Sequence, residues 1–161
     1  MNTQEFNLRS ALTAVIMAGF IAGSLDALAA VAILGKFNYV RVFQFVASGI
    51  FGQAAFAGGF KMVLYGIIFH YFIAFTFATF FLILVVYFPI LKDMPFLAGI
   101  AYGIFVWLVM NLLVLPQTHV PQDSLKLNNA LINMLILILM IGLPISYLTN
   151  WIYVPHPEDE M

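Results

Sequence analysis

Four long apolar stretches, separated by short polar joints, dominate the pattern of the chain. They cover roughly residues 11–35, 62–88, 96–115 and 127–154. Each is long enough to cross the hydrocarbon core of a bilayer as an α-helix, which takes about 20 residues. Short joints make consecutive helices antiparallel. The pattern therefore predicts an all-α polytopic membrane protein, with four transmembrane helices in an up-down bundle that forms a single domain over residues 1–154.

The segment between the first two stretches has a different pattern. Residues 43–59 carry no charge, and small or polar side chains recur along one helical face opposite a phenylalanine-rich face. Two placements fit this segment: an amphipathic helix that lies in the membrane interface, or a re-entrant half-helix packed among the spans. The small and polar face consists of Gln44, Ser48, Gly52, Ala55 and Gly59.

Composition supports a membrane location. The chain is 64% hydrophobic and 8% charged, whereas globular proteins are about 25% charged. A net charge of −1 without a basic block argues against a nucleic-acid partner. The absence of cysteine excludes disulfides, thiol catalysis and cysteine-ligated metals. The acidic residues 155–161 predict a disordered tail.

Asp26 is the only ionisable residue in the first apolar stretch. At 100° per residue it shares a narrow helical face with Gly19, Gly23 and Ala30. Glycines allow a neighbouring helix backbone to come close, so we expect the carboxylate to face protein. An unpaired acid at this depth costs about 2.5–3.5 kcal/mol on insertion scales. Another helix is therefore expected to supply a partner.

His70 is the corresponding ionisable residue in the second stretch. It lies on a face with Gly66, Ala74 and Ala78 at four-residue spacing. If the two small faces pack together, the carboxylate of Asp26 and the imidazole of His70 meet as a pair. One interpretation is a proton or ion relay in a transport path. The other is a structural pair that fixes the register of the two helices.

Further polar and small residues complete the candidate site. Amide side chains in apolar surroundings usually form hydrogen bonds between helices, and they are also candidates for a polar path. The predicted polar intramembrane site comprises Asp26, His70, Gln44, Gln53 and Asn111, and the predicted helix-packing positions are Gly19, Gly23, Gly66, Gly99 and Gly103.

We expect no cofactor, no metal and no enzymatic activity. The spacing of Asp26 and His70 is unlike a compact metal-ligand motif. A bis-histidine haem would need a second histidine at similar depth, and His119 and His156 lie in a loop and in the tail, so only the His70 of another copy would serve. No nucleophile–base pair, phosphate-binding loop or carboxylate dyad is present.

Several motifs carry a resemblance to a known group of proteins. They are the runs 43–49 and 54–59, the glycine-to-histidine run 66–75, the Gly99–Gly103 segment and the Met-Asn…Pro ending at 110–116. In these features the chain resembles a family of small four-span inner-membrane proteins of bacteria whose function is unknown. The resemblance covers most of residues 16–116. It implies a multi-pass protein of the bacterial cytoplasmic membrane and implies no activity.

Three functions fit the sequence. The first is an oligomeric transport or permeation protein that uses the Asp26–His70 site. The second is a non-catalytic accessory or assembly subunit of a larger membrane complex, and the third is a binder of lipid or another apolar ligand that uses the phenylalanine-rich segment. The expected partners are membrane lipids with further copies of the chain or a larger membrane complex. Charges on the two sides nearly balance, so they do not fix which side the termini face.

Overall fold

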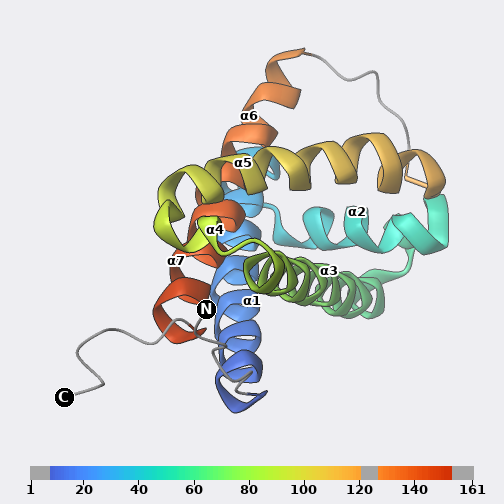
Figure 1. Cartoon of the computed structure of the whole chain (residues 1–161). Helices are drawn as coiled ribbons and strands as arrows, with labels where there is room; N and C mark the ends of the chain where they lie inside the picture. The colour runs from blue at the N-terminus through green and yellow to red at the C-terminus, as the bar shows by residue number, and fades with distance from the viewer. Residues whose placement is uncertain (1–7, 121–126, 154–161) are drawn as a thin grey trace.

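The computed structural model describes residues 8–120 and 127–153, and all regular structure within these residues is helical (Figure 1). The predicted tail at 155–161 lies outside the described residues. In chain order the helices are α1 (Leu8–Ala29), the π-helix η1 (Ala30–Leu34), α2 (Tyr39–Phe51), the 3-10 helix η2 (Gly52–Ala57), α3 (Gly59–Tyr87), α4 (Ile90–Asp93), α5 (Pro95–Leu108), the π-helix η3 (Val109–Val114), the 3-10 helix η4 (Leu115–Gln117), α6 (Leu127–Leu137), the π-helix η5 (Ile138–Gly142) and α7 (Leu143–Tyr153).

Five continuous helices in the described part of the chain are long and apolar enough to cross a membrane: Leu8–Leu34, Tyr39–Ala57, Gly59–Tyr87, Pro95–Gln117 and Ala130–Tyr153. Four of them correspond to the predicted spans. The remaining one, Tyr39–Ala57, contains most of the segment 43–59, for which the sequence predicts an interfacial or re-entrant placement. The all-helical architecture expected from the sequence is therefore confirmed, and the long apolar helices support the expected multi-pass membrane protein.

The Tyr39–Ala57 segment is not one regular helix. It begins four residues earlier than predicted, where the side chain of Asn38 accepts a hydrogen bond from the Arg41 N–H at 3.0 Å. The α-helix ends at Gly52, whose φ of +59° and ψ of −146° suit only glycine. The predicted stripe along 43–59 is therefore broken. Gln44 and Ser48 are buried on α2, whereas the stripe residues from Gly52 onwards follow a 3-10 geometry or begin α3.

Helices α1 and α3 run in opposite directions where they touch. A Cβ added at Gly19 would meet the ring of Phe75, and Ser24 is hydrogen-bonded to Tyr71. Residue numbers thus rise along α1 while they fall along α3. The end of the first apolar helix and the start of α3 consequently lie at the same end of this pair. The connecting Tyr39–Ala57 segment both leaves from and returns to that end.

A second close pair forms between α5 and the last helix. A Cβ at Gly99 would lie 2.9 Å from the Cα of Leu143, and one at Gly142 would lie 2.7 Å from the backbone nitrogen of Gly103. The Ser146 hydroxyl donates to the carbonyl of Pro95 at 2.8 Å. These contacts also run antiparallel, because residue numbers rise on one helix as they fall on the other.

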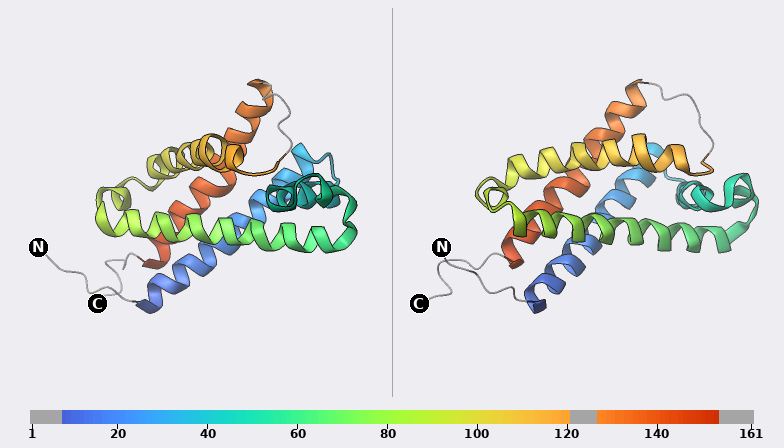
Figure 2. Two further views of the ribbon diagram at one scale, coloured as in Figure 1. Left: turned by 90° about the vertical axis from the view of Figure 1, so that its right-hand side faces the viewer. Right: turned by 45° about the vertical axis from the view of Figure 1, so that its right-hand side comes forward.

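The helix axes are crossed rather than nearly parallel. In Figure 2, α1 and the α6–α7 helix lie side by side and slant across α3 and α5, which are joined at one end through α4. Small residues at the crossings explain this, since glycine and alanine let two backbones approach at a single level without long interdigitating side chains. The expected alternation of directions is present, but the helices form two crossed layers rather than a bundle of nearly parallel helices. One layer holds α1 and the α6–α7 helix, and the other holds α3 and α5.

The core lies where these two layers of helices meet. It combines small side chains of α1, including Ala18 and Ala22, with larger ones of α3, α5 and the last helix. The rings of Phe81 and Tyr102 pack edge to face with centroids 4.7 Å apart. The Tyr102 hydroxyl donates to the Phe77 carbonyl at 2.6 Å, which satisfies a buried polar group.

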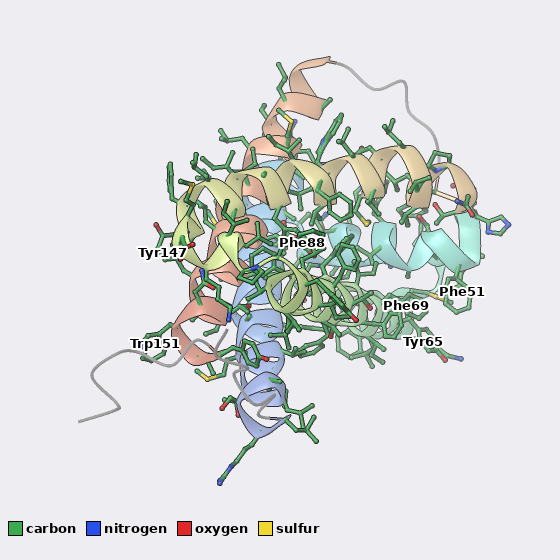
Figure 3. All side chains as sticks on the ribbon, viewed as in Figure 1. Phe51, Tyr65, Phe69, Phe88, Tyr147 and Trp151 are labelled. Atoms are coloured by element: carbon green, nitrogen blue, oxygen red, sulfur yellow. The ribbon has the colours of Figure 1, made fainter. Side chains whose placement is uncertain are left out.

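Large apolar side chains cover the outside of the molecule (Figure 3). The rings of Phe51, Tyr65 and Phe69 contact one another where α2 packs on α3, and Phe69 stacks on both of the others. Trp151 and Tyr147 project from α7. An exterior of this kind suits contact with lipid, which solvates apolar side chains that water would not.

We predict that Gly142→Ala lowers the stability of the folded protein, because the added methyl collides with the backbone of Gly99 and Gly103. Overpacking of this kind costs about 1–3 kcal/mol. Thermal unfolding in detergent micelles, followed by circular dichroism, should show a lower midpoint. The matched control is Gly49→Ala, whose new methyl would lie 3.8 Å from Thr118, an ordinary contact. Equal midpoints for the two variants would contradict the proposed crossing.

Candidate polar site at the α1–α3 contact

The candidate site is built on the close approach of α1 to α3. Gly19 and Gly23 are both buried on α1. A Cβ at Gly23 would lie 3.0 Å from the Cβ of Ala74 and 3.3 Å from the ring of Tyr71. Because neither glycine has a side chain, the α1 backbone itself forms the surface that α3 meets. Carbonyl groups of α1 are therefore open to polar side chains of α3.

His70 uses this opening. Its Nε2 lies 2.8 Å from the Gly23 carbonyl oxygen. A carbonyl only accepts hydrogen bonds, so Nε2 carries the proton and donates it. The imidazole also packs edge-on against Phe43 of α2, with ring centroids 6.3 Å apart. Three helices thus fix the orientation of this one ring.

A second interhelical hydrogen bond lies beside the first. The hydroxyls of Ser24 and Tyr71 are 2.8 Å apart, and either can donate. The ring of Tyr71 stacks on Phe20 of α1 with a centroid distance of 5.7 Å. Consecutive residues of α3, His70 and Tyr71, therefore bond to consecutive residues of α1, Gly23 and Ser24.

Asp26 lies about one turn beyond Gly23 on α1 and is half-buried. His70 is close enough to act on its charge electrostatically. Within the described residues, however, the carboxylate makes no direct hydrogen bond or ion pair. The expected direct contact between carboxylate and imidazole therefore does not form. The reason is that the Gly23 carbonyl, one turn earlier, takes the Nε2 proton of His70.

Two of the three amide residues of the predicted site have other partners, and the third is exposed. Gln44 is buried, and its Nε2 donates to the Gly59 carbonyl at 3.4 Å. Asn111 is buried as well, and its Nδ2 donates to the Trp107 carbonyl of the same helix at 2.9 Å. Gln53 is exposed on η2. The hydrogen bonds of these amides thus do not link them to Asp26 or His70.

Gly66, another predicted packing position, holds α2 against α3. A Cβ there would collide with the carbonyl group of Phe43. This contact sets the Phe43 ring beside His70 and makes α2 a wall of the site. Gly99 and Gly103 belong to the separate crossing of α5 with η5.

Metal ligands do not gather in the part of the chain that the structure describes, since no group of three or more histidine, aspartate or glutamate side chains is close enough to hold an ion. His119 is exposed just after η4, and its backbone N–H donates to the Gly49 carbonyl at 3.1 Å.

Sequence reasoning missed Ser24 and Tyr71, and it missed the Gly23 carbonyl that accepts the hydrogen bond of His70. Ser24 and Tyr71 adjoin the helical faces that the spacing singled out, and their positions next to Gly23 and His70 were the available signal. The Gly23 carbonyl leaves no trace in side-chain patterns. Elsewhere in the described residues, the indole Nε1 of Trp107 and the Oδ1 of Asn150 are buried without a hydrogen-bond partner.

Comparison with known proteins adds no assignment: no family model, no curated protein and no solved structure matches the chain. The resemblance to small bacterial inner-membrane proteins therefore stays a prediction. Any functional conclusion depends on the geometry described above.

We predict that the Ser24–Tyr71 hydrogen bond contributes about 0.6 kcal/mol, the average for interhelical polar contacts in membranes. A double-mutant cycle with Ser24→Ala and Tyr71→Phe would measure it from the free energy of unfolding in mixed micelles. Both changes keep the ring stacking on Phe20. Fully additive effects of the two substitutions would mean that the two hydroxyls are not coupled.

Proposed function

We propose that this chain is a non-enzymatic, four-span protein of the bacterial cytoplasmic membrane. In this proposal it assembles from several copies and carries protons, or a solute coupled to protons, across the bilayer through the Asp26–His70 site. The bacterial location comes from the sequence resemblance. The function rests on the chemistry of the α1–α3 contact.

One observation carries the proposal. Asp26 is an acid within an apolar helix. His70 is close enough to affect its charge electrostatically, but within the described residues no hydrogen bond or ion pair joins the two side chains. A purely structural pair is expected to satisfy the carboxylate directly, because an unpaired acid in the membrane is costly. A carboxylate left without a direct partner keeps its capacity to take up and release a proton. The adjacent imidazole of His70 is a second side chain that can carry a proton.

The need for several copies follows from size and surface. A single helical domain of 161 residues is small for a transporter built from inverted repeats. The polar groups of the described part are few, and its exterior is predominantly apolar. Association of several chains would bring further copies of Asp26 and His70 together around one path.

The direction of the helices supports four spans. Because α1 and α3 are antiparallel where they touch, the Tyr39–Ala57 segment starts and finishes at one end of the pair. A segment that returns to the side it left does not cross the bilayer. It then lies in the interface or re-enters, and α3, α5 and the last helix supply the other three spans.

We predict that cysteines at positions 36 and 61 are labelled from the same side of the membrane. The chain has no natural cysteine, so the single variants Lys36→Cys and Lys61→Cys report directly. An impermeant maleimide, applied to intact cells and to inverted vesicles, would give the side. Asp93→Cys, in α4, is the control and should label from the opposite side. Labelling of positions 36 and 61 from opposite sides would mean that Tyr39–Ala57 crosses the membrane.

We predict that Asp26→Asn reduces proton flux in proteoliposomes to the level of protein-free liposomes. The amide keeps the shape of the side chain but does not exchange a proton near neutral pH. A pH-sensitive dye inside the vesicles would measure flux under an imposed potential. Asp93→Asn makes the same chemical change in the α4 turn and should leave flux unchanged.

Two outcomes would contradict the transport proposal. The first is normal flux in the Asp26→Asn variant, with Asp26→Glu equally active. The second is the absence of flux from the natural protein together with purification only in complex with a different protein. That second result would favour the accessory-subunit function.

A further inference from the structure

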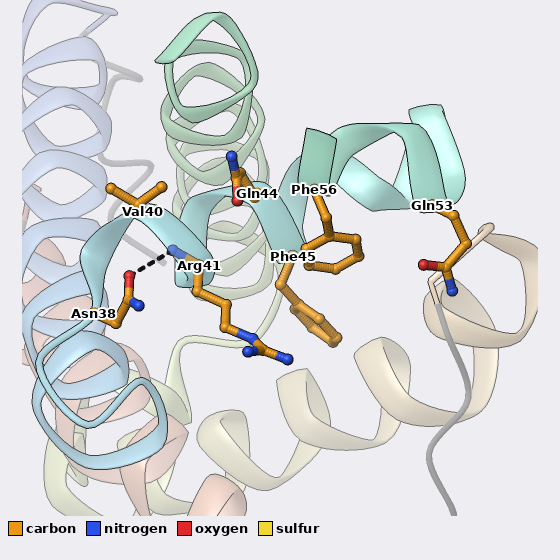
Figure 4. Close-up of a pocket in the computed structure, with 7 residues that line it drawn as sticks. All are labelled: Asn38, Val40, Arg41, Gln44, Phe45, Gln53 and Phe56. Atoms are coloured by element: carbon orange, nitrogen blue, oxygen red, sulfur yellow. Dashed lines mark hydrogen bonds between the residues drawn. The ribbon is translucent and has the colours of Figure 1, made fainter. Parts of the chain in front are cut away.

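A second polar feature lies on α2 and η2, away from Asp26. It is a half-open groove with a volume of about 680 Å³ (Figure 4). This volume is within the range of small-molecule sites, roughly 300–1,000 Å³. The lining includes Asn38, Arg41, Gln44, Phe45, Gln53 and Phe56.

The polar groups of the groove are mainly hydrogen-bond donors. Arg41 is exposed, and its guanidinium makes no hydrogen bond or ion pair with the described residues. Asn38 uses its Oδ1 to cap α2, which leaves its NH₂ group available. Gln53 adds a carboxamide at the opposite end of the groove. The lining carries one formal charge, which is positive, and no carboxylate.

Two aromatic rings lie between these polar groups. In Figure 4 the rings of Phe45 and Phe56 are adjacent and extend to the same side as the side chains of Arg41 and Gln53. Phe45 is exposed, so its ring is open to an apolar ligand. A cation beside an apolar floor fits a molecule with an anionic head and an apolar tail.

The groove lies at the end of the molecule where membrane phosphates are expected. Lys36 and Lys61, at the end of the first helix and the start of α3, flank the same segment as Arg41. Phe37 is 81% exposed and Tyr39 is exposed too. Exposed aromatic and basic residues together are typical of the membrane–water interface. The two consecutive left-handed residues, Lys36 and Phe37, make a tight turn that directs them outward.

We infer that this groove binds the headgroup of an anionic phospholipid. The phosphodiester accepts hydrogen bonds from the fork of the Arg41 guanidinium, whose geometry matches phosphate oxygens, and from the amides of Asn38 and Gln53. The first part of the acyl chains lies over Phe45 and continues into the bilayer. The site is independent of proton transfer at Asp26.

The test is lipid binding to the purified full chain in detergent, measured by native mass spectrometry. Phosphatidylglycerol is the probe, phosphatidylcholine the zwitterionic comparison, and glycerol 3-phosphate the headgroup without acyl chains. We expect phosphatidylglycerol to bind in preference to both. Arg41→Gln should weaken its binding by about fivefold or more, the effect expected for losing one basic residue near an anionic lipid. Arg41→Lys should lie between, since it keeps the charge but not the fork.

Lys61→Gln is the matched control. It removes one positive charge at the same end of the molecule but outside the groove, where the Lys61 ammonium lies over the Tyr65 ring. Its binding of phosphatidylglycerol should stay within about twofold of the natural protein. Equal losses for Lys61→Gln and Arg41→Gln would show diffuse surface attraction and overturn the site. So would equal binding of phosphatidylcholine, or saturation by glycerol 3-phosphate alone. Unfolding midpoints equal to that of the natural protein confirm that each variant is folded.

Discussion

The arrangement depends most on the contact between Gly23 of α1 and α3. With no side chain at this position, the Cβ of Ala74 and the ring of Tyr71 pack against the α1 backbone, and the imidazole of His70 reaches a carbonyl oxygen at 2.8 Å. In lipid there is no hydrophobic force that pushes apolar helices together, so close packing and polar contacts must do so. One glycine supplies both here, because the same missing side chain permits the approach and uncovers the acceptor.

The crossing of α5 and η5 follows the same physics with a different result. There the backbones of Gly99, Gly103 and Gly142 meet, and the Ser146 hydroxyl satisfies the Pro95 carbonyl. Among the described residues, no acidic or basic side chain is in the contacts that these glycines make. The two crossings thus differ: close packing and a hydroxyl–carbonyl hydrogen bond hold α5 against the last helix, whereas the α1–α3 contact also contains an acid and an imidazole. The small residues of α1 that face the core join the two.

Much of this could be predicted from the sequence, and the exceptions have physical causes. Hydrophobic length located the spans, and the four-residue spacing around Gly23 and His70 indicated which faces carry the polar groups. The acceptor of His70 could not be predicted, because a backbone carbonyl has no sequence signature. The end of α2 at Gly52 was missed for another reason: the glycine also fitted the small-residue stripe, and a helical pattern does not reveal which glycine adopts a left-handed conformation. The crossing angle between the two layers of helices depends on how the side chains fit together at each contact, and the periodicity of the sequence does not encode that fit.

Helix α2 connects the two proposed sites. Its Phe43 packs against His70, while Arg41 and Phe45, two residues to either side, line the groove. The Phe43 carbonyl sits where a Cβ of residue 66 would be, so α2 has no room to move closer to α3 at this level. Because Phe43 contacts the imidazole, α2 lies between the groove and His70. Helix α2 therefore presents one face to the polar site at the α1–α3 contact and another face to the groove.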